Sequence, residues 1–196
     1  MTRPSWHTKI LRAVREMHEL HGFKLLTPCT VYLTLKDGRR VTYMPDALLL
    51  RKRRGLHAIV IEAESNPPAK IVPGDVSLAS FVKSRFAEMY PNKEVGIGRR
   101  FRGVRSFRDT YDARRPALRL DGNDRLFLRG NMIGKLSFLL IVPDRESANY
   151  QGRYLNLFLR KQWGRTRPFR YARCIACRAP TVPSARRSIG RILSHL

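Results

Sequence analysis

Three strand-like segments joined by two short turns constrain the fold of this chain more than any other feature. Residues 30–35 and 41–50 are separated by Asp37-Gly38, a dipeptide typical of a tight hairpin turn. Residues 58–64, the third segment, follow Arg53-Arg54-Gly55, which fits a three-residue hairpin loop with glycine at its left-handed position. The sequence therefore predicts an antiparallel arrangement of three strands between residues 30 and 64.

Helical periodicity is found on both sides of these strands. Apolar residues recur at intervals of three and four over residues 5–21, and Ser5 can cap the start of that helix. A second helix is predicted from Asp75 or Ser77 to about Tyr90, because its apolar residues follow the same spacing. These patterns predict one helix before the strands and one after them.

The rest of the chain contains one further clear strand signal. Residues 136–142 are continuously apolar, as in a strand that is buried on both faces. Residues 150–162 fit either a strand or a helix, and the chain after Gly164 is rich in Arg and Pro and is predicted to be irregular until residues 184–196. The order of elements predicts an α/β fold with a mixed central β-sheet flanked by helices. We expect an α/β core over residues 1–145 and a basic C-terminal helix or extension, residues 146–196, packed on or beside it.

Net charge limits the function of the chain. Its 196 residues include 39 Lys+Arg against 15 Asp+Glu, a formal net charge of +24. Such an excess repels itself unless a polyanion neutralises it, and nucleic acid is the most common polyanion inside cells. An anionic membrane surface, or adaptation to a hot or salty habitat, is the alternative explanation. We therefore expect DNA or RNA as the partner.

The basic residues are concentrated in three segments. One lies in the loop after the second strand, one is interleaved with aromatic residues between positions 99 and 111, and one spans positions 160–191. Arg and Lys side chains of this kind bind phosphates and position a nucleic acid without reading its sequence. The first two segments supply the predicted nucleic-acid-binding residues, which are Lys52, Arg53, Arg54, Arg99, Arg100, Arg102, Arg105 and Arg108.

Three carboxylates are predicted to converge in this otherwise basic chain. Glu62 and Glu64 lie two residues apart in a predicted strand, so they point to the same side. If Arg53-Arg54-Gly55 forms the hairpin loop, Asp46 lies directly opposite Glu62 in the neighbouring strand. Carboxylates this close repel each other, and a hard divalent cation such as Mg²⁺ or Mn²⁺ would relieve that repulsion. The alternative is a solvent-facing hairpin whose acids pair with nearby arginines.

This arrangement resembles the PD-(D/E)XK nuclease superfamily. The resemblance is carried by Pro45-Asp46 at a strand end and by Glu62-Ala63-Glu64 in the next strand, within a helix, three strands, a helix and a further strand. It implies a restriction-endonuclease-like core and a DNA endonuclease that uses Mg²⁺ or Mn²⁺. By the resemblance, Asp46, Glu62 and the backbone carbonyl of Ala63 bind the metal, and Asp46, Glu62 and Glu64 form the catalytic set.

The chain departs from this family at one motif position. Glu64 stands where the family usually has Lys, although some restriction-type members carry Glu-x-Glu, and Glu64 could bind metal or deprotonate the attacking water. The family often adds an acid from its first helix, for which Glu16 and Glu19 are the candidates. Many such nucleases act as dimers, so the resemblance also suggests a homodimer. The rival hypotheses are a non-catalytic nucleic-acid-binding or packaging protein and an RNA-bound protein of ribosomal type.

The remaining motifs bear on the compartment and on zinc. Residues 1–10 lack the apolar stretch of a secretory signal, and no run approaches the roughly 18 apolar residues of a membrane span. Three cysteines are too few for a disulfide framework, so we expect a cytoplasmic protein with no membrane partner. Cys174 and Cys177 are spaced like half of a zinc knuckle, and His18 and His21 could complete that site only if the tail folded onto the first helix.

Overall fold

The predicted hairpin of the second and third strands lies at the centre of a six-stranded sheet, sheet A, whose strand order is β1-β2-β5-β6-β10-β11. The computed structural model describes residues 5–16, 19–26, 29–52, 55–65, 71–84, 87–91, 118–120 and 126–196. The strands of sheet A are β1 (Glu19–Leu20), β2 (Phe23–Leu26), β5 (Ala47–Lys52), β6 (Leu56–Ala63), β10 (Ile133–Val142) and β11 (Tyr171–Ala176). β5 is antiparallel to β2 and β6, whereas β10 is parallel to both β6 and β11, so the predicted mixed sheet is confirmed.

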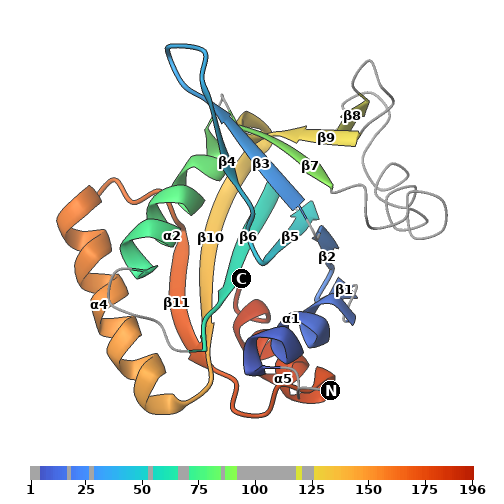
Figure 1. The fold of residues 1–196 in the computed structure, drawn as a ribbon, viewed down its shortest axis with the longest axis vertical. Coiled ribbons are helices and arrows are strands. Elements are labelled where there is room, and N and C mark those ends of the chain that lie inside the picture. The colour runs from blue at the N-terminus through green and yellow to red at the C-terminus, as the bar shows by residue number, and fades with distance from the viewer. Residues whose placement is uncertain are drawn as a thin grey trace.

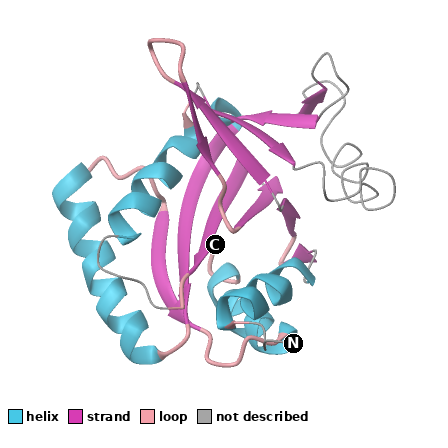
Figure 2. Cartoon of the chain, in the orientation of Figure 1, coloured by secondary structure: helices cyan, strands magenta, loops and turns pink. Residues whose placement is uncertain are grey.

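Helices cover sheet A on both faces (Figures 1 and 2). α1 (Trp6–Glu16) and α5 (Val182–Leu193) lie on one face, and α2 (Ile71–Ser80) and α4 (Arg145–Trp163) lie on the other. β6 is buried along its whole length, because its residues pack alternately into the two apolar cores. The core under α1 and α5 contains Ile10, Val14, Ile59, Ile61, Ile141 and Ile189, and the core under α2 and α4 contains Val60, Val76, Phe138, Leu140 and Leu155.

A second sheet, sheet B, is antiparallel and has the strand order β4-β3-β7-β9-β8. Its strands are β3 (Cys29–Thr34), β4 (Arg40–Tyr43), β7 (Ala87–Pro91), β8 (Leu118–Leu120) and β9 (Leu126–Arg129). The turn predicted between β3 and β4 is confirmed. Gly38 has a φ of 82°, and the Asp37 carboxylate accepts the Arg39 N–H at 3.0 Å.

The single strand predicted over residues 41–50 is wrong, because the chain divides there into β4 and β5, which belong to different sheets. Met44, Pro45 and Asp46 connect the two strands. Proline lacks the N–H that a sheet ladder needs, so the pairing of β4 ends before it. This break carries the chain from sheet B into sheet A and leaves Asp46 at the entrance to β5.

The second predicted helix is wrong in its C-terminal half. α2 ends at Ser80, a 3₁₀ turn, η1 (Phe81–Lys83), follows, and β7 then pairs with β3. Ala87 and Met89 are buried at alternating positions, which suits a strand as well as the helical spacing did. Pairing with a distant strand decided between the two structures.

The C-terminal third is more regular than the sequence indicated. Residues 150–162, ambiguous in sequence, lie within α4, whose N-cap Asp144 accepts the Ser147 N–H at 2.7 Å. The expectation of irregular chain before residue 184 is wrong for residues 171–176, which form β11 beside β10. The division of the chain at residue 145 stays a prediction. Among the described helices, none combines the length and the hydropathy needed to cross a bilayer.

Candidate active site

The predicted register between the two motif strands is confirmed. β5 and β6 pair with Ala47 opposite Ile61 and Leu48 opposite Val60, so the next position in the same register brings Asp46 to Glu62. Asp46 lies one residue before β5, where the pleat of the strand no longer dictates the direction of its side chain. Asp46 and Glu62 are therefore neighbours, but each carboxylate turns to different partners.

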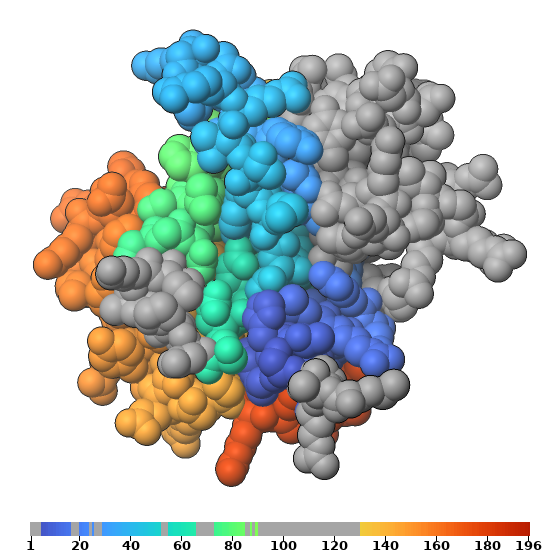
Figure 3. All heavy atoms as spheres, viewed as in Figure 1, coloured from blue at the N-terminus to red at the C-terminus, as the bar shows by residue number. Residues whose placement is uncertain are grey.

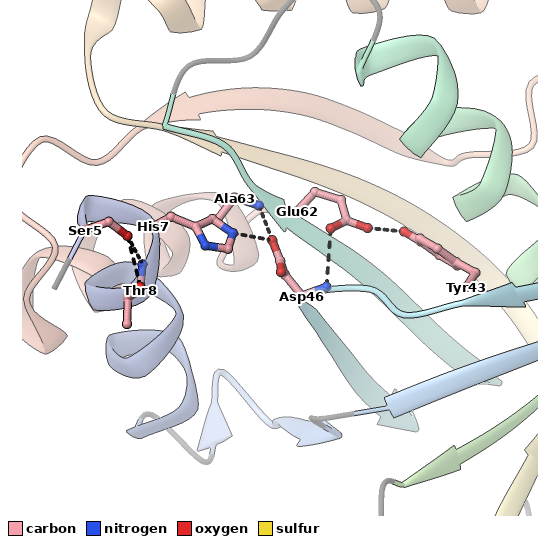
Figure 4. A network of polar contacts seen from close by, with 7 residues as sticks. All are labelled: Ser5, His7, Thr8, Tyr43, Asp46, Glu62 and Ala63. Carbon is pink, nitrogen blue, oxygen red and sulfur yellow. Dashed lines mark hydrogen bonds and ion pairs between the residues drawn. The ribbon is translucent and has the colours of Figure 1, made fainter.

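The Asp46 carboxylate is held between β6 and α1 (Figure 4). Its Oδ2 atom accepts the backbone N–H of Ala63 at 2.8 Å and lies 3.4 Å from Nε2 of His7, in the first turn of α1. The contact with His7 is an ion pair when the imidazole is protonated. The Ala63 residue predicted to flank the metal is thus tied to Asp46 through its N–H.

Glu62 is buried, with only 7% of its surface exposed. One carboxyl oxygen accepts the backbone N–H of Asp46 at 3.3 Å, and the other accepts a short hydrogen bond from the Tyr43 hydroxyl (Figure 4). Tyr43 is the last residue of β4, so the connection between the two sheets delivers both Tyr43 and Asp46 to this place. Glu62 is oriented by two donors from one short segment.

Two further acids complete the cluster. Glu64 follows β6 directly, and Asp75 comes from α2, on the face of sheet A where Val60 and Val76 are packed. Electrostatic repulsion couples Asp75 to both Glu64 and Asp46. Oδ2 of Asp75 is buried and has no hydrogen-bond partner in the part of the chain that the structure describes. We refer to Asp46, Glu62, Glu64 and Asp75 as the acid cluster.

Burial and mutual repulsion perturb the acid cluster. Loss of water contact, together with the charges of Asp46 and Asp75, raises the pKa of Glu62 to about 8, although the Tyr43 hydrogen bond opposes that rise. Burial is the largest cause that raises the pKa of Asp75 to about 6, and repulsion from Glu64 and Asp46 adds to it. Burial also raises the pKa of Glu64, which His7 opposes. At neutral pH Glu62 therefore keeps its proton and adds no full negative charge to the cluster.

Basic side chains do not neutralise this cluster in the described residues: no Lys or Arg forms an ion pair with Glu62, Glu64 or Asp75. The alternative in which arginines pair with the acids is thus unsupported for these three residues. Carboxylate oxygens are the ligands that Mg²⁺ and Mn²⁺ prefer, and the buried Asp75 oxygen without a partner is suited to such an ion. The donor set fits by its chemistry, although among the described residues no three His, Cys, Asp or Glu side chains already surround one point.

Three residues of this site were missed by the sequence analysis. Asp75 was interpreted only as a helix cap, and Tyr43 only as a strand residue. His7 occupies the place for which an acid of the first helix was expected. Glu16 instead pairs with Arg12 at 2.9 Å at the other end of α1, and the side chain of Glu19 lies outside the described residues. Only the pairing of distant segments reveals these contributions.

The predicted nucleic-acid-binding residues lie apart from the acid cluster or outside the described residues. β5 begins after Asp46 and ends at Lys52, so its backbone at Lys52 is about 20 Å away along the strand. Arg53, Arg54, Arg99, Arg100, Arg102, Arg105 and Arg108 are outside the described residues. Lys52, the described member of the basic segment predicted after the second strand, is thus at the opposite end of β5 from Asp46.

Cys174 and Cys177 do not form half of a zinc site. Cys174 is buried in the core under α2 and α4, whereas Cys177 belongs to the core under α1 and α5. Burial raises the pKa of Cys174 to about 12, which disfavours the thiolate that would bind metal. His18 is outside the described residues.

Comparisons of the chain with protein-family models, with curated proteins and with solved structures found no match.

Proposed function

We propose that this protein is a divalent-metal-dependent nuclease that hydrolyses DNA phosphodiester bonds at the acid cluster. The observation that carries this proposal is the proximity of four acids, from the residue before β5, the end of β6 and α2, in a chain of net charge +24. Gathering like charges in a partly buried place is unfavourable unless a cation or protons offset the repulsion. A structural role alone does not explain why, among the described residues of a chain so rich in arginine, Glu62, Glu64 and Asp75 form no ion pair with an arginine.

The order of elements supports the proposed likeness to the PD-(D/E)XK superfamily. α1 is followed by the antiparallel strands β2, β5 and β6, then by α2 and by β10, which is parallel to β6. This succession matches the one predicted from the sequence except at its first strand, because the predicted residues 30–35 form β3 of sheet B and β2 takes that place in sheet A. Sheet B is inserted between β2 and β5 and again between α2 and β10.

Each residue of the acid cluster has a role in the proposed reaction. Asp46, Glu62 and Asp75 would hold Mg²⁺ or Mn²⁺, and the ion would lower the pKa of a water and stabilise the charge that builds on the phosphate. Glu64, at the exposed edge, accepts the proton from the attacking water. The Ala63 N–H and His7 orient Asp46, and Tyr43 together with the Asp46 N–H orients Glu62.

The experiment is a cleavage assay with matched acid variants. Plasmid DNA and single-stranded DNA are incubated with the protein in Mg²⁺, in Mn²⁺ or in EDTA. Asp46→Asn and Glu62→Gln should each lower the cleavage rate by 10²-fold or more, as an order of magnitude for losing a group that acts in the transition state. The controls are Asp37→Asn in the β3–β4 turn and Glu146→Gln in the first turn of α4, which remove exposed acids of the same kind.

Two results would contradict the proposal. Equal cutting by wild type and by both site variants would mean that the activity comes from another site or another protein. DNA that is retarded but never cut, with either metal, would favour the rival function of a non-catalytic nucleic-acid-binding protein. The replacement of the family's Lys by Glu64 is the specific feature that favours that rival.

A further inference from the structure

The last fifty residues carry charge of a single sign. After Glu146 the chain contains no Asp or Glu, and every Lys and Arg in that stretch is exposed. Like charges without counterions repel, so this density implies an external polyanion. The cations are Arg153, Arg160, Lys161, Arg165, Arg167, Arg170, Arg173, Arg178, Arg186, Arg187 and Arg191.

α5 displays part of this charge on a rigid element. Its inner face packs Ala185, Ile189 and Ile192 into the core under α1 and α5, and Thr181 caps its first turn. Arg187 and Arg191 lie one turn apart on the exposed side, a like-charge spacing that destabilises a helix. The charge on α5 therefore weakens the helix slightly, so a contribution to folding does not explain it.

The start of α5 lies at the same edge of sheet A as the acid cluster. β11 ends at Ala176, paired with Val142, while the preceding residue of β10 pairs with Ala63. The Cys177 carbonyl accepts the indole N–H of Trp6 at 3.0 Å, and the next residue of α1 is His7, which contacts Asp46. Arg178 therefore belongs to the edge where the acids converge.

The face of sheet A that α5 covers is also basic at its other end, near the start of β6. His57, at the start of β6, is surrounded by Arg51, Lys135 and Arg170, and burial together with these three charges lowers its pKa to about 4. Arg51 is held in place by the Phe23 ring, 4.1 Å from its guanidinium carbon, and by the His21 carbonyl at 3.2 Å. Phe23 belongs to the same core as α5. Cations thus occur at both ends of the α5 face.

We propose that the sugar-phosphate backbone of a nucleic acid lies along the exposed side of α5, bound by Arg178, Arg186, Arg187 and Arg191 and leading to the acid cluster. We call these four residues the α5 track. The chemistry at the end of the track rests on the proposed function, whereas the binding of nucleic acid along α5 does not. The twelve residues of α5 span about 18 Å, the length of roughly five nucleotide steps in one strand of a duplex.

α4 offers a comparison within the same molecule. It lies on the other face of sheet A, and in the space-filling view its orange residues are at the left of the molecule, whereas the dark blue residues of α1 are near the centre (Figure 3). Its exposed side mixes Arg153 and Arg160 with Glu146 and with the apolar Tyr150 and Leu157, which are 61% and 47% exposed. An exposed surface whose charged residues are all arginines is the better match for a phosphate backbone.

The test is a binding titration of a fluorescently labelled 20-base-pair duplex, in EDTA so that no cutting occurs. The triple variant Arg178→Gln, Arg187→Gln, Arg191→Gln is compared with Arg153→Gln, Arg160→Gln, Lys161→Gln on α4, which loses the same three charges. We expect the α5 variant to bind at least about tenfold more weakly at 0.1 M salt and its salt slope to fall by about 2–3, because each phosphate contact adds about 0.9 to that slope. The α4 variant should stay within about twofold of wild type.

The outcomes separate this inference from the nuclease proposal. Equal weakening by both triple variants, or by neither, would overturn the α5 track, because binding would then depend on total charge or on other residues. Binding to phosphatidylserine vesicles that depends on the α5 arginines, with DNA binding unchanged, would also overturn it. Restored binding in the corresponding Arg→Lys triple would show that charge at these positions acts, rather than a change of fold. If wild type binds through α5 but never cuts with Mg²⁺, the track stands and the nuclease proposal fails.

Discussion

At the scale of single residues, Glu62 combines features of an active-site acid with features of a structural acid. It is buried, it accepts two hydrogen bonds, and its pKa of about 8 keeps it protonated at neutral pH. A folded-state pKa above the value of about 4.3 in an unfolded chain means that the native state binds the extra proton. The stability contributed by that proton is full below about pH 4.3 and is lost as the pH rises to about 8.

Glu62→Gln should therefore change the pH dependence of stability in EDTA. The amide imitates the protonated carboxyl and does not ionise in the unfolded chain, so the variant should be more stable than wild type at both pH values, and its advantage should grow by about 2 kcal/mol between pH 6.5 and pH 8.5. Asp75, with a pKa of about 6, is already largely ionised in this window and does not obscure the difference. Urea unfolding at the two pH values measures it, and parallel pH profiles would show that Glu62 is not protonated. Mg²⁺ should stabilise wild type more at pH 8.5 than at pH 6.5, but should not stabilise Glu62→Gln in this way.

Tyr43→Phe tests the donor that orients Glu62. Removing the hydroxyl leaves a buried carboxyl oxygen without its partner, which should cost about 1–3 kcal/mol of unfolding free energy. Because that hydrogen bond lowers the pKa of Glu62, its loss should raise the pKa and move the pH profile of metal-dependent cleavage to higher pH. Cleavage measured from pH 6 to 9 gives this shift, and Tyr32→Phe in the neighbouring strand β3 is the control. An unmoved profile would assign Tyr43 a purely structural role.

At the scale of elements, two 3₁₀ turns meet where sheet B joins sheet A. η2 (Gly130–Met132) packs on η1, and a Cβ atom on Gly130 would lie 2.3 Å from the Ser84 carbonyl oxygen and 2.4 Å from that of Val82. These atoms belong to the backbone and cannot swing aside. Gly130→Ala should therefore lower the unfolding free energy by about 2 kcal/mol or more.

Gly134→Ala is the control for that variant, since its Cβ would meet only the Leu56 carbonyl oxygen at an ordinary 3.6 Å. Chemical denaturation should place Gly134→Ala within about 1 kcal/mol of wild type. If the two alanine variants are equally stable, the close approach of η1 and η2 is not maintained in solution.

Elements also show where local pattern was insufficient. Residues 79–89 carry apolar spacing that fits a helix, yet the chain leaves α2 at Ser80 and enters β7. Buried Val31 of β3 pairs with Met89, so the choice depends on a partner more than fifty residues earlier in the chain. β11 was hidden for a related reason, because its only fully buried residue is Cys174 and an exposed arginine interrupts its pattern.

At the scale of the whole molecule, the C-terminal segment distinguishes between an independent core over residues 1–145 and a fold that needs the whole chain. An independent core over residues 1–145 would survive the removal of that segment, but β11 contributes buried Cys174 to the core under α2 and α4, and α5 contributes buried side chains to the core under α1 and α5. Deleting residues 165–196 removes, among others, the buried side chains of Phe169, Ile189 and Leu193, whose burial is worth about 1.5–3 kcal/mol each, against a total stability of about 5–15 kcal/mol. We expect the truncated chain to lose its near-ultraviolet circular dichroism and its cooperative urea transition. A truncated chain that unfolds as cooperatively as wild type would establish the shorter domain.

Local chemistry in the sequence was enough to determine the β5–β6 register, the Asp37-Gly38 turn, the start of the first helix and the mixed α/β character of the fold, because hairpin loops and side-chain periodicity act over a few residues. The predicted extension of that helix to residue 21 is wrong, because α1 ends at Glu16 and Glu19–Leu20 form β1, which pairs with β2. Local chemistry was also enough to bring Asp46 next to Glu62. The tertiary structure alone decided that Tyr43 ends a strand of sheet B while Asp46 precedes a strand of sheet A, that Asp75 and His7 join the acids, and that α5 begins at the same end of sheet A as these acids. Those outcomes depend on which distant surfaces bury each other, and burial is a property of the assembled cores rather than of any one segment.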